Sequence, residues 1–186
     1  MDTAVKEAAV AQFLHGYPQM VRAACDHPAL LGCADVDWSR IPGCPAGIPA
    51  LLRSLLDEEA GPAALPVLEN VLMNGVFHMS AAMPAALPFL IRLAAVPDIA
   101  VRSDLVEILV VAAELSLPVD ADDEHQVLLF GKDDDHPERE WCRAVFTTHA
   151  SAVRALLEDE SLPDGLISVD DRERLLEVVE PQRSPS

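Results

Sequence analysis

Acidic residues are the side chains that could most directly do chemistry here, because nine of them gather between Pro118 and Glu140. Only Lys132 and Arg139 oppose them. Carboxylates at this density can bind a divalent cation or attract a basic protein, and a solvated loop without a ligand is the alternative. The candidate partner-binding residues are Asp120, Asp122, Asp123, Glu124, Asp133, Asp134 and Asp135, with the apolar Phe130 between the two runs.

A calcium site is the first alternative, since Asp120, Asp122 and Glu124 alternate as they do in an EF-hand loop. That loop needs Gly at its sixth position, where this chain has His125. It also needs Glu at the twelfth position, where this chain has Gly131. The pattern therefore does not indicate specific calcium binding.

A zinc site is the second alternative, because Cys25, His27, Cys33 and Cys44 lie close together in the sequence. Their spacings contain no C-x2-C pair of the kind that most structural zinc sites use. Reduced thiols that pack as small apolar residues explain these cysteines better. We expect no metal and no other cofactor.

Catalytic motifs are missing from the sequence. It has no Gly-rich phosphate loop, no G-x-S-x-G and no H-E-x-x-H. Cys142 could act as a nucleophile with His149 as its base, but on one helix their seven-residue separation corresponds to about 10 Å. That distance is too long for a hydrogen bond between the two side chains. We therefore expect a protein that is not an enzyme.

A repeated segment organises the elements that carry these residues. The stretch Ile48–Leu56 (IPALLRSLL) is nearly copied at Leu87–Ala95 (LPFLIRLAA), and a weaker copy follows at Ser151–Asp159. Arg53 and Arg92 occupy the same place in the first two copies, 39 residues apart. A period near 40 residues with two helices per unit is typical of an α-solenoid. The sequence predicts an all-α fold, a short α-solenoid with an acidic loop insertion.

We expect one domain over residues 1–180 and a disordered tail over 181–186. Its predicted parts are an N-terminal helical cap (1–27), a loop (28–47), two repeats (48–117), the acidic insert (118–140) and a third repeat (137–180). The cap is expected to hold the helices Thr3–His15, capped by Thr3, and Gln19–Asp26, and Trp38 is expected to anchor the loop on the first repeat. The second repeat is expected to hold the helices Leu87–Ala95 and Ile99–Ser116, and the third to open with one helix from Pro137 to Glu158.

Single side chains are also assigned from the helical pattern. Leu52, Leu90, Leu105 and Leu109 are predicted core residues. His78 lies between apolar neighbours and is predicted to be a hydrogen-bonded structural residue. A second candidate binding surface lies on the concave face formed by the second helices of the repeats, at Glu69, Asn70, Met73 and Glu107.

The second repeat resembles a HEAT repeat, which has Pro early in its first helix, Asp in the turn and Val-Arg at the start of its second helix. Pro88, Asp98, Val101 and Arg102 stand in these positions. With Asp37–Trp38–Ser39 upstream, the stretch is similar to small actinobacterial HEAT-repeat proteins of the immunity-protein type. The resemblance implies a protein that binds and inhibits a cognate, basic toxin domain. A general adaptor or regulatory scaffold is the alternative.

The net charge of the chain limits the classes of partner that it can attract. With 31 acidic and 13 basic residues the formal net charge is −18, which disfavours nucleic acid and anionic membranes and attracts a basic protein. A HEAT-like DNA glycosylase would need a basic concave face, so this enzyme is the less favoured reading. No signal peptide and no long apolar run is visible, and we expect a soluble cytoplasmic protein. The oligomeric state is left open.

Overall fold

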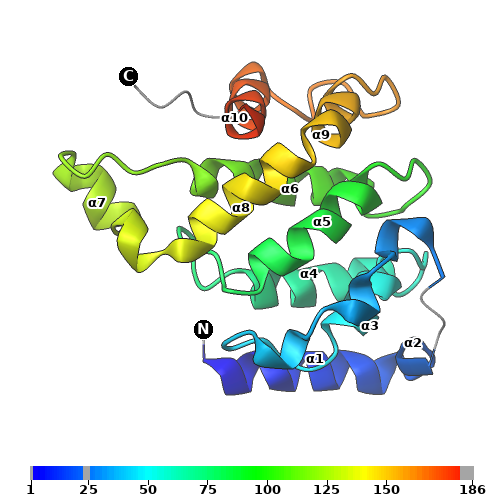
Figure 1. Ribbon diagram of the computed structural model, residues 1–186. Coiled ribbons are helices and arrows are strands. Elements are labelled where there is room, and N and C mark those ends of the chain that lie inside the picture. Colours follow the sequence, from blue (N-terminus) through cyan, green and yellow to red (C-terminus); the bar gives the residue numbers. More distant parts are fainter. Residues whose placement is uncertain (1, 23–25, 181–186) are drawn as a thin grey trace.

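The computed structural model describes residues 2–22 and 26–180 of the chain. Within these residues, helices form all the regular structure except one isolated bridge between Met73 and Met79. The α-helices are α1 (Thr3–Gly16), α2 (Gln19–Arg22), α3 (Ile48–Ser54), α4 (Gly61–Leu72), α5 (Met83–Ala94), α6 (Arg102–Ser116), α7 (Glu124–Phe130), α8 (Pro137–Thr148), α9 (Ala150–Leu157) and α10 (Val169–Val179) (Figure 1). The predicted all-α class is confirmed.

The consecutive helices of the two predicted repeats pack together, α3 against α4 and α5 against α6. The helix α1 packs against α4, whereas α8 packs against both α5 and α6, and α10 packs against α6 and α8. Figure 1 shows the chain advancing from α1 at the bottom to α9 and α10 at the top. None of the described helices is long and apolar enough to cross a membrane.

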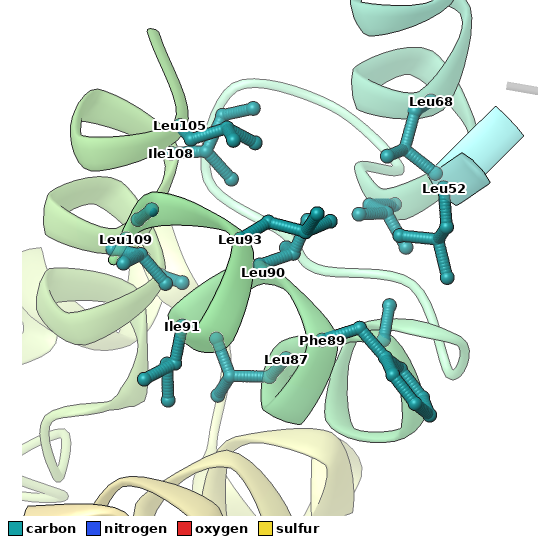
Figure 2. Close-up of a cluster of buried hydrophobic side chains, with 14 of the residues drawn as sticks. Leu52, Leu68, Leu87, Phe89, Leu90, Ile91, Leu93, Leu105, Ile108 and Leu109 are labelled. Carbon is teal, nitrogen blue, oxygen red and sulfur yellow. The ribbon is translucent and has the colours of Figure 1, made fainter. Parts of the chain in front are cut away.

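The core is continuous, because its buried apolar side chains form one cluster that runs from Val10 to Val179. All four leucines predicted as core, at positions 52, 90, 105 and 109, are at most 1% exposed. In Figure 2, Leu90 of α5 lies between Leu52 on one side and Leu105 and Leu109 of α6 on the other. The helical periodicity of the apolar residues therefore placed the buried face correctly.

The helices of the second repeat begin elsewhere than predicted. The helix α5 starts at Met83 rather than Leu87, because Pro84 takes the first turn, where its missing N–H costs nothing. Pro88 consequently lies inside α5. The helix α6 starts at Arg102 rather than Ile99, and the buried Arg102 side chain donates from Nε to the carbonyl of Ala94 at 2.8 Å.

Two further predictions about helix boundaries were wrong. Asp2 caps α1 in place of Thr3, since its carboxylate accepts a hydrogen bond from the backbone N–H of Ala4. The predicted helix 137–158 is broken at His149, whose φ of −101° and ψ of 18° leave the helical region. After the break the chain continues as α9, whose residues Val153, Leu156 and Leu157 are buried. The predicted helix 19–26 is present over Gln19–Arg22 (α2), and its predicted continuation into 23–25, like the predicted tail 181–186, lies outside the described residues.

The segment 28–47 is irregular apart from three 3-10 turns, η1 (Pro28–Leu30), η2 (Cys33–Asp35) and η3 (Trp38–Arg40). Trp38 is buried, and its indole N–H donates to the carbonyl of Cys33 at 3.0 Å. Its ring centroid lies 6.2 Å from that of Phe89 on α5. Trp38 therefore packs this segment against α5, in the second predicted repeat, whereas the sequence predicted anchoring on the first.

The acidic insert is not simply a loop. It contains α7 and the 3-10 turn η4 (Asp133–Asp135) before α8 begins at Pro137. Asp123 starts α7, because its carboxylate accepts hydrogen bonds from the backbone N–H groups of His125 and Gln126 at 2.9 and 3.1 Å. These bonds lower the pKa of Asp123. One of the predicted binding carboxylates is thus a helix cap.

Candidate protein-binding groove

The carboxylates of the insert divide into two groups. Asp133 lies 3.1 Å from the guanidinium of Arg139 and 3.9 Å from that of Arg143, so its charge is matched within the protein. Asp120 accepts a hydrogen bond from the backbone N–H of Asp122 at 3.0 Å. Asp120 is itself exposed, as are Asp122, Glu124, Asp134 and Asp135.

Phe130, the predicted apolar anchor of the insert, is only partly exposed and packs against the core. Its ring meets that of Phe77 edge-on, with the centroids 5.4 Å apart. The buried guanidinium of Arg139 donates to its carbonyl oxygen. Phe130 therefore packs within the protein and does not offer its ring to a partner. Leu128 on the same helix is 81% exposed.

The second predicted surface forms one groove. Glu69, Asn70 and Met73, from α4 and its C-terminal end, line it together with Glu107 of α6. The groove has a volume of about 520 Å³. The rest of its lining comes from the same two helices and from the loop after α4, at Leu65, Pro66, Gly75, Val76, Asp104, Ile108 and Val111.

Sequence reasoning placed Glu107 on this surface but missed the other three lining residues of α6, although the spacing of all four carries a helical signal. Asp104, Glu107, Ile108 and Val111 are spaced i, i+3, i+4 and i+7, which places them on one face. This face lies beside the one that Leu105, Leu109 and Ala112 bury. The groove was not predicted in full because its remaining lining depends on how α4, α6 and the loop after α4 pack together.

The apolar side chains that line the groove differ in how much of their surface is exposed. Leu65 and Ile108 are 7% exposed and form its inner part. Val76 and Val111, at 79% and 41% exposed, belong to its outer part. An apolar side chain of a partner would cover surface here that is now in contact with water.

The charge of the groove has one sign. Three carboxylates line it, those of Glu69, Asp104 and Glu107, and no Lys, Arg or His occurs among its described lining residues. Carboxylates next to apolar side chains suit a cationic side chain with an apolar neighbour. The lining offers no thiol, hydroxyl or imidazole that could act as a nucleophile or a proton shuttle.

A buried lysine fixes the loop that completes the groove, and sequence reasoning missed it. Lys6 of α1 is 2% exposed. Its ammonium donates to the carbonyl of Val71 at 2.9 Å and to Oδ1 of Asn74 at 2.7 Å. Burial lowers the pKa of Lys6, and the Cys44 thiol beside it raises the pKa. Lys6 therefore ties α1 to the end of α4, where a cation also meets the negative end of the helix dipole.

The candidate catalytic residues lie apart from the groove. Burial raises the pKa of the Cys142 thiol to about 12, so this thiol stays protonated and unreactive at neutral pH. Its sulfur lies 3.9 Å from that of Met79. Cys33 is buried and Cys44 partly buried, and Cys25 lies outside the described residues. Among the residues that are described, no three His, Cys, Asp or Glu side chains converge as metal ligands.

The groove is thus built by α4, α6 and the loop that follows α4, and it exposes apolar surface together with negative charge that no described lining residue balances. Its function is inferred from this chemistry. Comparisons of the chain with family models, with curated proteins and with solved structures find no match to any of them.

Proposed function

We propose that this chain is a non-enzymatic, HEAT-like protein-binding module whose α4–α6 groove receives a basic segment of a partner protein. One observation carries the proposal: Glu69, Asp104 and Glu107 face a groove whose lining holds no cation among the described residues. Unmatched carboxylates beside water-exposed apolar side chains favour a ligand that brings positive charge and an apolar side chain of its own.

The groove is a better binding surface than the insert. The insert uses Asp123 as a helix cap and Asp133 as a partner of buried Arg139, and its Phe130 packs inward. In the groove, the side chains of Glu69 and Glu107 are exposed. Neither caps a helix or pairs with a buried arginine among the described residues. The exposed insert carboxylates would then speed the encounter with a basic partner by long-range attraction rather than hold it.

The volume and lining set the size of the bound segment. At about 520 Å³, the groove matches sites that receive a few side chains of a ligand. Met73 is a flexible, polarisable side chain that adapts to different apolar groups. The expected ligand is therefore a short segment in which Arg or Lys flanks an aliphatic or aromatic residue.

The immunity-type role implied by the HEAT resemblance also requires a partner segment that carries positive charge beside an apolar residue. A basic toxin domain would insert such a segment into the groove, and the formal net charge of −18 would steer its approach. A general adaptor would use the same groove for a basic partner that is not inhibited. Inhibition of the partner's own activity on binding separates the two roles.

Paired charge variants test the groove. Short peptides selected from a random library for binding to the whole chain would be measured by fluorescence anisotropy. Glu69→Gln/Glu107→Gln should weaken binding of the basic peptides about 10-fold or more, as loss of two close charge pairs does. Glu58→Gln/Glu59→Gln removes the same charge at an exposed turn outside the groove and is the matched control. Equal affinities of the two variants would refute the groove as the binding site.

A further inference from the structure

The loop that completes the groove is clasped to the acidic insert by two pairs of rings. Phe77 meets Phe130 at the end of α7, and His78 stacks on His136 just before α8, with ring centroids 4.8 Å apart and planes inclined by 12°. The two preceding residues of the same loop, Gly75 and Val76, line the groove. The loop 74–78 therefore contacts the insert and the groove at once.

The histidine pair is tightly enclosed on the insert side. Gly131 has a φ of +73°, and a Cβ atom there would lie 2.6 Å from Nε2 of His136. Nδ1 of His136 lies 2.9 Å from Oε1 of Glu138. A residue with a side chain at position 131 would thus displace the His136 ring, so the stack depends on this glycine.

His78 differs from its sequence prediction as a hydrogen-bonded residue at one ring atom, Nδ1. Its Nδ1 is buried, and no described residue offers it a hydrogen bond. A neutral imidazole tolerates this with Nδ1 as the acceptor atom. A protonated ring would place a buried N–H donor and a positive charge where no acceptor stands.

The charged groups around His78 oppose its protonation on balance. They are His136, Glu138 and Arg139 at the start of α8, and Asp133 of the insert pairs with Arg139, which is 3% exposed. Burial lowers the pKa of His78 below its ordinary value of 6.5, and the charges of His136 and Arg139 lower it further, while Glu138 raises it. The ring therefore stays neutral at neutral pH.

We propose that the His78–His136 stack is an acid-sensitive latch, in which protonation of His78 parts the loop 74–78 from the insert. The folded state holds fewer protons on His78 than the unlatched state does. The stability that the latch contributes is therefore present above a pH of about 6.5 and is lost as the pH falls below it. Release would move Gly75 and Val76, and the resulting effect on binding rests on the proposed function, whereas the latch itself does not.

Hydrogen exchange of the whole chain tests the latch. Amide protection, corrected for the intrinsic rate at each pH, should fall in residues 74–78 and 124–136 between pH about 7.5 and about 5.5. His78→Phe keeps an aromatic ring in the stack without a titrating group, so its protection should be the same at both values. His149→Gln is the matched control, because His149 also has a pKa lowered by burial but lies between α8 and α9. Its response should equal that of the wild type.

Two results would overturn the latch: unchanged protection in the wild type, or a pH response of His78→Phe equal to that of the wild type. Should circular dichroism show that His78→Phe does not fold, an NMR titration of the wild type decides. The latch requires the Phe130 ring signals to shift together with the titration of His78. Phe130 signals that stay constant through that titration contradict it.

Discussion

At the scale of single residues, the two lysines of the chain offer a clean comparison, since Lys6 is buried and Lys132 is exposed. We predict that Lys6→Met lowers the free energy of unfolding by about 1–3 kcal/mol, because the carbonyl of Val71 and the side chain of Asn74 lose a donor. Lys132→Met should change it by less than about 0.5 kcal/mol. Urea unfolding followed by circular dichroism measures both, and equal midpoints would contradict the role of Lys6.

The acidic residues of η4 are also unequal, although the sequence shows three consecutive Asp residues. Asp133→Ala should destabilise the protein by about 1–3 kcal/mol, because buried Arg139 loses its carboxylate. Asp134→Ala, at an exposed neighbour, should be neutral within about 0.5 kcal/mol. Thermal melting checks the pair, and a destabilised Asp134→Ala with an unaffected Asp133→Ala would reverse the assignment.

At the scale of elements, α6 has a core face and a groove face. Leu109→Ala should lower the free energy of unfolding by about 2–5 kcal/mol, the range for a buried leucine. Val111→Ala, two residues on and 41% exposed, should cost less than about 1 kcal/mol. Chemical denaturation of the two variants measures the difference, and similar losses would mean that the faces of α6 are assigned incorrectly.

Local sequence predicted some of these elements and not others. The capping box of Ser168 and Asp171 at the start of α10 can be recognised from local sequence, because its hydrogen bonds join residues only three positions apart. The break at His149 and the helix α7 were not predicted. Short helices and helix breaks depend on packing against distant segments, as Phe130 on Phe77 shows.

At the scale of the whole molecule, composition predicted the sign of the surface charge, and helical periodicity predicted the core. Four of the groove residues were named from the sequence, but as the second choice after the insert. A count of carboxylates cannot show which of them are already paired, and Asp123 and Asp133 are. These pairings depend on how α7, η4 and α8 fold, so the choice between the two surfaces required the structure.

The same charge distribution predicts how binding responds to salt. Association of a basic peptide should slow as the ionic strength rises, because screening shortens the reach of the acidic surface. Dissociation should change much less, since the apolar contacts in the groove set it. Stopped-flow fluorescence separates the two rates, and an association rate independent of salt would contradict electrostatic steering.

The central claim is that the groove between α4 and α6, and not the acidic insert, holds the partner. An NMR titration of the isotope-labelled chain with a selected basic peptide tests it most directly. Backbone amide shifts should change in residues 65–76 and 104–111, which carry the lining of the groove. Changes confined to residues 120–135 would place the partner on the insert and contradict the claim.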